Sequence, residues 1–496
     1  MPIRSRFAAL AAAALCAGCA GARASTRLAP TSPVGELRRA ADSLVNDPMF
    51  RSALWGILIV DPERGDTLYA HNAGKLFIPA SNQKVLISTV ALKQLGPDFR
   101  FTTSFAASGP VEEGVLRGDL VVIGNGDPTM SDHMATDAMI PMRAIADSLA
   151  GLGIRRIAGA LVRGGDAFPG PAAGTTWPWG SLDSPSFAGV DELTFNEGLT
   201  RIVVRAGSAP GDAPTVQTVP ARTFPRVIVR ARTGVAGQQT RRRGPGALRA
   251  RADSADPSAI VVDGDIAAGD SAILTVTQRE PWFGYLQALR EALGDRGIVV
   301  DSGVSRSLVD GETVPLFSVM SPPLREILGP FLKPSQNQIG EILIRALGVA
   351  GTGVGSPDSG ARVVRRQIQE WGGAEDGLIV RDGSGLSRQD LVTPETLVRV
   401  FDAIRADTAF HVFYDALPIA GVDGTIRGRM QNTAAQGNVH AKTGTLDGVR
   451  SLSGYVTTAS GRLLIFSMMA NNWTVPVREV ERVQDAIAVR LAELRM

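Results

Sequence analysis

The 496-residue chain is predicted to fold as a mixed α/β protein in which one domain is interrupted by a long β-rich insertion. Two observations predict this organisation. Strand and helix patterns occupy both ends of the chain, with two strand candidates near the N-terminus and three near the C-terminus. Between them, residues 101–317 alternate short β-like runs with Gly/Pro turns. The two ends are therefore expected to form one domain around a shared sheet.

The N-terminal part of this domain is assigned to residues 30–100. The runs "ALWGILIVD" (53–61) and "TLYAHN" (67–72) flank the turn "PERGD", so they predict a hairpin. A helix is expected to begin near Ser81 and to end at "LGPDF", where glycine and proline stop it.

The insertion is interpreted as one or two domains with helices near 138–152 and 283–296. Its run "RRRGPGALRAR" (241–251) predicts an arginine-rich surface loop, and a contact to an anionic polymer is the alternative. Residues 318–496 complete the interrupted domain. Helical patterns there cover 323–348, 361–372, 393–407 and 475–494, and strand patterns cover 438–446, 451–458 and 462–472.

Residues 1–24 are predicted to be a signal peptide, because two arginines precede the apolar run "FAALAAAALCAG". Two cleavage patterns stay open. "ARA" before Ser25 suits ordinary signal peptidase, whereas "LCAGC" resembles a lipoprotein signal that would leave Cys19 lipidated and tethered to a membrane. Either pattern predicts export to the periplasm or cell envelope. Cys16 and Cys19 both lie in this leader, so no disulfide is expected in the mature chain.

Composition argues against several classes of function. The net charge of +2 provides no basic field, so no nucleic-acid partner is expected. The four histidines are scattered and lack the spacing of a zinc site. We therefore expect neither a metal nor an organic cofactor.

The stretch "PASNQKVLISTVAL" contains Ser81 and Lys84, three residues apart at the start of an apolar helix. This spacing places both side chains on one helix face. A serine becomes a nucleophile when a base removes its proton, and a lysine kept neutral by burial and a nearby second cation can be that base. Arginine cannot, although 46 of the 51 cationic residues are arginines. The alternative is an N-cap serine beside a lysine that reaches solvent.

Two further motifs carry polar groups at useful spacings. In "HAKTGTL" (440–446), a strand would offer the Lys442 cation, the Thr443 hydroxyl and the backbone of Thr445, with a glycine that leaves room for a ligand. An edge strand with a polar end is the alternative. In "KPSQNQIGE", the spacing of Ser335 and Asn337 fits a turn between helices, with an N-cap at Ser335 as the alternative.

In the order Ser-x-x-Lys, Ser-x-Asn and Lys-Thr-Gly, the three motifs form the set of penicillin-recognising serine enzymes. The chain resembles the class C low-molecular-mass penicillin-binding proteins, the DacB-like D-alanyl-D-alanine carboxypeptidase/endopeptidase family. The stretches "GDLVVIGNGDPTM", "RDGSGLSR" and "LPIAGVDGTIRGRM" are similar too. This resemblance implies a penicillin-binding/β-lactamase-like domain with a five-stranded antiparallel sheet, flanked by helices and interrupted by inserted domains.

The resemblance also implies the reaction. Ser81 would form an acyl-enzyme with D-alanyl-D-alanine stem peptides of peptidoglycan, and β-lactam antibiotics would be covalent inhibitors. Lys84 would be the base, and Ser335 would relay a proton to the leaving amine. The predicted substrate-binding residues are Asn337, Lys442, Thr443, Gly444, Thr445 and Arg388.

Some relatives read the substrate's side-chain amine with an acidic residue of the insertion, for which Asp183 and Asp191 are the candidates here. Two other functions stay open. A β-lactamase or esterase would keep the acyl-enzyme and change the substrate, although about 250 residues between Ser81 and Ser335 exceed what a β-lactamase needs. A non-catalytic cell-wall-binding lipoprotein would keep the fold without turnover.

Overall fold

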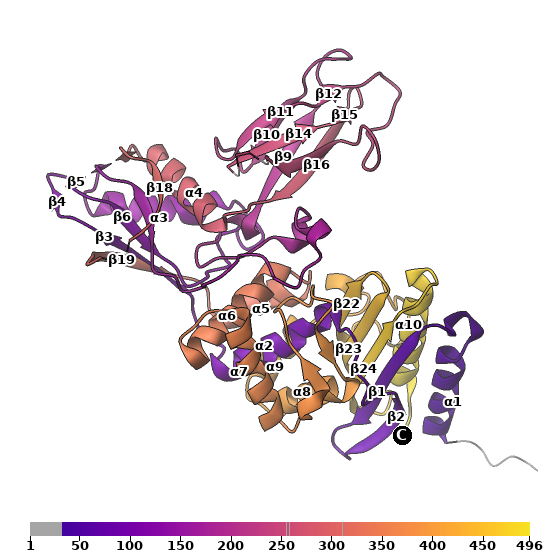
Figure 1. Cartoon of the computed structure of the whole chain (residues 1–496). Helices are drawn as coiled ribbons and strands as arrows, with labels where there is room; N and C mark the ends of the chain where they lie inside the picture. Colours follow the sequence, from indigo (N-terminus) through magenta and orange to yellow (C-terminus); the bar gives the residue numbers. More distant parts are fainter. Residues whose placement is uncertain (1–31, 254, 257, 310) are drawn as a thin grey trace, which may run out of the picture.

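The computed structural model describes residues 32–253, 255–256, 258–309 and 311–496. The predicted signal peptide and both of its cleavage patterns lie outside these residues. Figure 1 shows a body of helices around one sheet, built from both ends of the chain, with the insertion projecting from it as two lobes.

A five-stranded antiparallel sheet forms the middle of this body, in the order β2-β1-β24-β23-β22. The strands are β1 (Leu54–Asp61), β2 (Asp66–His71), β22 (His440–Leu446), β23 (Val449–Thr457) and β24 (Leu463–Asn471). Because β1 pairs with β24, backbone hydrogen bonds join the two ends of the chain. The predicted mixed α/β fold with this sheet is confirmed.

Helices cover both faces of the sheet. Along β1, Ile57 and Ile59 face one helical layer and Leu58 faces the other, because side chains alternate along a strand. The first layer consists of α1 (Pro33–Val45) and α10 (Val477–Glu493). The second layer consists of α2 (Gln83–Gln94), α5 (Leu324–Leu332), α6 (Asn337–Thr352), α7 (Pro357–Glu370), α8 (Pro394–Arg405) and α9 (Phe410–Ala416).

Helix α2 runs through the second layer, and every residue from Gln83 to Leu92 is buried. A helix enclosed on all sides carries apolar residues all round, as "VLISTVAL" does. The 3₁₀ turn η2 (Ala80–Asn82) precedes it. Gly96 follows it with a φ of 85°, so the helix ends where the sequence predicts.

The first unit of the insertion combines sheet and helix. Its sheet β18-β8-β6-β3-β19 and the helices α3 (Met139–Gly151) and α4 (Pro281–Asp295) share one apolar core. The strands of this sheet are β3 (Thr102–Ala107), β6 (Leu120–Ile123), β8 (Leu161–Gly164), β18 (Val304–Val309) and β19 (Val314–Met320). A side sheet contains β4 (Val111–Glu112), β5 (Val115–Leu116), β7 (Arg156–Ile157) and β17 (Val299–Val300).

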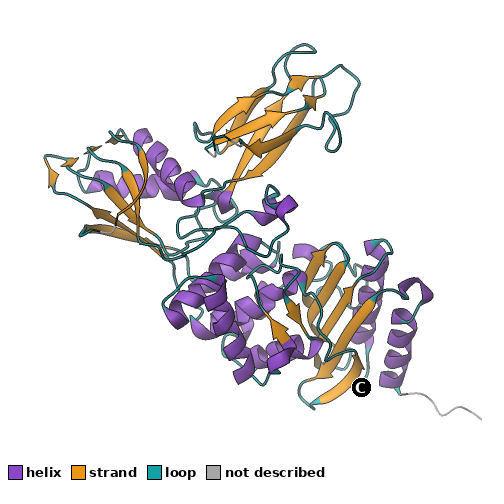
Figure 2. Cartoon of the chain, in the orientation of Figure 1, coloured by secondary structure: helices purple, strands orange, loops and turns teal. Residues whose placement is uncertain are grey.

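The second unit of the insertion is built from strands, as Figure 2 shows. They are β9 (Leu199–Arg205), β10 (Thr215–Val219), β11 (Arg226–Val229), β12 (Arg232–Thr233), β13 (Arg249–Ala252), β14 (Ala259–Asp263), β15 (Asp265–Ile266) and β16 (Ser271–Thr277). A separate core around Ile202 and Val262 holds them together. The run 241–251 is largely exposed here, where Arg249 and Arg251 pair with a carboxylate of β14.

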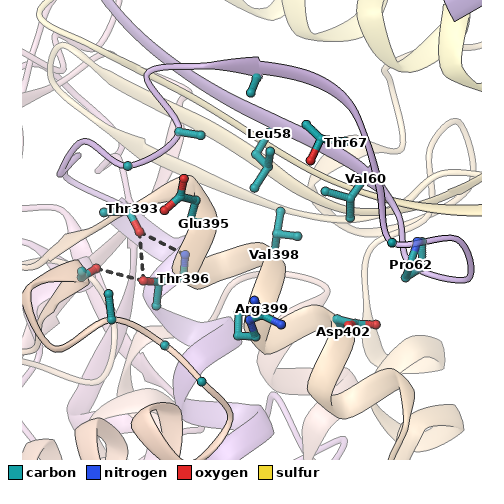
Figure 3. Close-up of a pocket in the computed structure, with 18 of the residues that line it drawn as sticks. Leu58, Val60, Pro62, Thr67, Thr393, Glu395, Thr396, Val398, Arg399 and Asp402 are labelled. Carbon is teal, nitrogen blue, oxygen red and sulfur yellow. Dashed lines mark hydrogen bonds between the residues drawn. The ribbon is translucent and has the colours of Figure 1, made fainter.

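A cavity of about 500 Å³ opens between the β1–β2 hairpin and the first half of α8, with Leu58, Val60 and Val398 among its lining residues and Glu395 and Arg399 beside them (Figure 3). None of the predicted site residues lines this cavity. Over the described ranges, no single helix is long and apolar enough to cross a bilayer, and α6 with α7 meets that criterion only as a pair bent by 75°.

Candidate active site

Ser81 and Lys84 meet at the entrance of α2. The amine nitrogen Nζ of Lys84 lies 2.9 Å from Ser81 Oγ. The same nitrogen lies 2.7 Å from Asn337 Oδ1 and 2.6 Å from the Ser384 carbonyl oxygen. Lys84 has no exposed surface, whereas Ser81 is partly exposed. The lysine therefore does not reach solvent, and that alternative is excluded.

The contacts of Lys84 set the direction of its lone pair. A neutral amine has two N–H bonds and one lone pair, whereas carbonyl oxygens only accept. Asn337 Oδ1 and the Ser384 carbonyl take the two N–H bonds. The lone pair then faces Ser81 Oγ, whose hydroxyl can donate to it. This is the arrangement of a general base beside its nucleophile.

Burial lowers the pKa of Lys84 from 10.5 to about 7. Three carboxyl groups oppose this effect and raise the pKa, in the order Asp382, Glu341 and Asp390. The amine is thus poised to lose a proton near neutral pH, which a general base requires.

The Ser-x-Asn and Lys-Thr-Gly motifs meet through a second buried lysine. Lys442 Nζ donates to Ser335 Oγ at 2.8 Å and to the Thr443 carbonyl at 3.0 Å. Burial lowers the pKa of Lys442 well below its ordinary value, and the positive charges of Lys84 and Arg450 lower it further. Since Asn337 contacts the first lysine and Ser335 the second, the three motifs form one connected cluster.

A glycine lets β22 approach the turn that carries the nucleophile. A Cβ at Gly444 would lie 2.4 Å from the Pro79 carbonyl oxygen and 2.1 Å from Ser451 Oγ, closer than any side chain allows. Ser451 Oγ donates to that carbonyl at 2.7 Å. Asn82 Nδ2 donates to Ser453 Oγ at 2.9 Å. The structure shows that this glycine makes room for the residues that lead into η2, and the space for a ligand stays a prediction.

Ser335 lies in the turn between α5 and α6, as predicted, whereas Asn337 is the first residue of α6. Ser335 has a φ of 66°, in the left-handed region that non-glycine residues seldom adopt. The N-cap of α6 is Gln336, whose side chain accepts the N–H of Ile339 at 2.7 Å. The N-cap alternative for Ser335 is therefore wrong, and its hydroxyl is left to contact the second lysine.

The remaining residues of the Lys-Thr-Gly strand differ in exposure. Thr443 is buried, and its Oγ1 lies 2.7 Å from Thr425 Oγ1. Thr445 is exposed, and Arg450 on the neighbouring strand donates to its hydroxyl. The outer end of the strand is therefore the part that faces solvent.

The predicted residues at the periphery of the site, Arg388, Asp183 and Asp191, differ in their exposure and contacts. Arg388 is exposed and donates to the Asp447 carbonyl at 2.8 Å, just beyond β22. Asp183 is exposed at a cavity of about 310 Å³. Asp191 instead points inward, where burial and Glu192 raise its pKa to about 9. Of the two acidic candidates, Asp183 is placed better to meet a cation from solvent.

A segment of the insertion, residues 171–188, lies against the motif residues, and we call it the covering segment. The Ser186 carbonyl accepts from Asn337 Nδ2 at 2.9 Å. Trp177 Nε1 donates to Asp382 Oδ2 at 2.9 Å. Sequence reasoning missed both contacts. It also missed the carbonyl that binds the first lysine, although that residue lies in "RDGSGLSR".

Metal binding finds no support in this arrangement. Within the part of the chain that the structure describes, no group of three or more His, Cys, Asp or Glu side chains is placed to hold a metal ion. The polar groups of the site are hydroxyls, amines, amides and carbonyls, which suit acyl transfer through serine.

The sequence profile of the D-Ala-D-Ala carboxypeptidase 3 (S13) family matches residues 37–494. The chain belongs to this family. It is therefore a serine-type D-Ala-D-Ala carboxypeptidase, and the family and activity predicted from the order of the three motifs are confirmed.

Individual relatives match most of the chain. The D-alanyl-D-alanine carboxypeptidase of Actinomadura sp. (strain R39) is 34% identical over 479 residues, which are 92% of this chain and 85% of the relative. The carboxypeptidase DacB of Haemophilus influenzae is 28% identical over 84% of this chain and 85% of its own. The crystal structure of penicillin binding protein 4 (dacB) from Haemophilus influenzae superposes with a TM-score of 0.78 at 24% identity, covering 93% of this chain and 99% of that one. This structure supports the fold.

Proposed function

We propose that Ser81 attacks the carbonyl of the penultimate D-alanine of a peptidoglycan stem peptide. The Oγ–C bond forms, the C–N bond to the terminal D-alanine breaks, and water later hydrolyses the acyl-enzyme. The observation that carries this proposal is the buried Lys84 amine, 2.9 Å from Ser81 Oγ and oriented by Asn337 Oδ1 at 2.7 Å. Lys84 takes the serine proton, and Ser335 passes a proton to the departing amine.

Lys442 is the receptor for the terminal carboxylate. Its pKa is depressed by burial and by neighbouring cations, and an approaching carboxylate favours the charged form. Thr443 assists from the same strand. Arg388 lies at the end of that strand, where it can contact the substrate further out.

The backbone N–H groups of Ser81 and Thr445 are proposed as the oxyanion hole. One such donor contributes ~3 kcal/mol to transition-state stabilisation. Gly444 lies between these two elements and permits their approach. Asn337 orients the peptide amide. When substrate binds, Asn337 Nδ2 would donate to the substrate in place of the Ser186 carbonyl.

β-Lactam antibiotics are proposed as covalent inhibitors that acylate the same serine. The structure of Haemophilus influenzae penicillin binding protein 4 complexed with a novel β-lactam has this fold, with a TM-score of 0.73 at 24% identity. The protein acts in the periplasm or cell envelope, because its substrate lies outside the cytoplasm. Attachment through a lipidated Cys19 remains a prediction.

Ser81→Ala tests the nucleophile. The wild type is expected to release D-alanine from purified muropeptides and to retain fluorescent penicillin, and the variant to do neither. Ser88→Ala is the matched control, because Ser88 lies in α2, directly after the 3₁₀ turn of Ser81, and donates to a helix carbonyl at 2.7 Å. Covalent label on Ser81→Ala would contradict the proposal. A wild-type label lost within seconds would favour a β-lactamase, and an unlabelled wild type would favour a binding protein without turnover.

A further inference from the structure

The carbonyl that orients Lys84 belongs to a buried loop, residues 381–390, which we call the acid-tied loop. Glu341 on α6 holds one side of this loop. Its Oε1 accepts the backbone N–H of Gly383 at 3.0 Å and that of Ser384 at 2.9 Å. The Ser384 carbonyl then points to Lys84 Nζ at 2.6 Å.

Asp382 holds the other side of the loop. Its Oδ1 accepts the N–H of Gly385 at 2.7 Å, and its Oδ2 accepts the N–H of Ser387 at 2.6 Å. The indole N–H of Trp177 adds a third donor to the same Oδ2 at 2.9 Å. Asp382 is 1% exposed, so these donors replace the water that an ionised carboxylate would otherwise bind.

The third donor comes from the covering segment, not from the penicillin-binding part of the chain. Trp177 is 7% exposed, and its ring packs edge-on against Phe187 with centroids 5.6 Å apart. Thr176 strengthens the attachment by donating to Ser387 Oγ at 2.8 Å. The insertion is thus hydrogen-bonded to the loop that orients the catalytic amine.

We propose that Trp177 and Asp382 are positioning residues for acylation. The indole N–H holds the Asp382 carboxylate, the carboxylate shapes the acid-tied loop, and the loop aims the Ser384 carbonyl at Lys84. This inference rests on the proposed role of Lys84 as the base. It gives the insertion a part in proton transfer that does not depend on contact with the substrate.

Charged groups face Lys84 from several elements. They are Asp382 and Asp390 of the acid-tied loop, Glu341 of α6 with its buried partner Arg345, and Lys442 of β22. Burial and the nearby Asp382 raise the pKa of Asp390 well above its ordinary value, which favours its neutral form. The carboxylate of Glu341 forms an ion pair with the buried guanidinium of Arg345. Asp382 is accordingly the charge that raises the pKa of Lys84 most.

Trp177→Phe removes the N–H donor and keeps an aromatic ring in place. We expect the rate of acylation by fluorescent penicillin at pH 7 to fall about tenfold, as for the loss of one hydrogen bond to a charged group. The melting temperature should stay near that of the wild type. Trp179→Phe is the matched control, because Trp179 is 88% exposed two residues further on, and this variant should acylate at the wild-type rate.

The variant Asp382→Asn distinguishes a role of Asp382 in positioning Lys84 from a role in stabilising the fold only. The charge of Asp382 raises the pKa of Lys84. Removing this charge should therefore move the acidic limb of the pH–rate profile for acylation to lower pH by about one unit. The maximal rate should fall as well. The proposal is overturned if Trp177→Phe acylates as fast as Trp179→Phe, or if Asp382→Asn lowers the rate without moving the limb. A wild type that takes no penicillin would instead defeat the proposed function.

Discussion

Lys84 and Lys442 are both fully buried, yet their surroundings differ. Lys84 contacts a hydroxyl and two carbonyl oxygens, with carboxyl groups beyond them. Lys442 contacts one hydroxyl and one carbonyl, and the charges that affect its pKa are the cations Lys84 and Arg450. Burial lowers the pKa of both lysines, but only Lys84 has carboxylates that limit the effect.

This difference separates two tasks for the same side chain. A base must keep its pKa near the working pH, and burial balanced by the acid-tied loop does so for Lys84. An anion receptor must lack a carboxylate of its own, so that the ligand supplies it. The surroundings of Lys442 meet that condition. Replacing Lys84 should therefore impair proton transfer, whereas replacing Lys442 should impair binding of the substrate carboxylate.

The largest effect is expected from Lys84→Met, which keeps an unbranched side chain, one atom shorter, and removes the amine. The acylation rate should fall about 10³-fold, within the range of general-base catalysis. The control is Lys93→Met, because Lys93 lies on the same helix but is 46% exposed and pairs with Asp407. Stopped-flow labelling with fluorescent penicillin measures the rates. If Lys84→Met kept a rate within tenfold of the wild type, Lys84 would not be the base.

A smaller and more selective effect is expected from Lys442→Met. With a peptide that has a free terminal carboxylate, kcat/KM should fall about 10²-fold, as expected when one partner of a buried charge pair is removed. With the corresponding terminal amide, the loss should stay below tenfold, because that substrate brings no charge to pair. Equal losses for both substrates would show that Lys442 is not the carboxylate receptor.

The sequence was sufficient for the parts of the site that local pattern encodes. The spacing of Ser81 and Lys84 predicts that they share a helix face, and the pattern of residues 440–446 predicts a strand. The strands β1 and β24 were also recognisable, since each carries a run of apolar residues long enough to be buried. The motif order then named the family, and with it the pairing of strands from opposite ends of the chain.

Contacts between distant loops were not predictable in this way. Trp177 and Asp382 are 205 residues apart, and neither lies in a periodic element. The Ser384 contact uses a backbone carbonyl, which every residue has. The left-handed backbone of Ser335 has no residue-type signal either, since such a φ is usually signalled by glycine or asparagine.

The smallest expected effect concerns stability rather than rate. The pKa of Lys84 is about 7 in the folded protein and 10.5 for a free lysine, so between these values the unfolded chain binds more protons. Stability should therefore rise with pH in this window. Between pH 7 and 8 the contribution of this group is about 1 kcal/mol, which for a chain of this length raises the melting temperature by about 1 °C.

Lys84→Met lacks this contribution, so its melting temperature should rise by about 1 °C less than that of the wild type over the same interval. Thermal melts of both proteins at pH 7 and pH 8 measure the difference. Other groups titrate in both proteins, and those whose pKa does not depend on Lys84 cancel in the comparison. Parallel changes would mean that Lys84 remains protonated in the folded protein up to pH 8. The amine could then not act as a base near neutral pH, and the contrast between the two lysines would disappear.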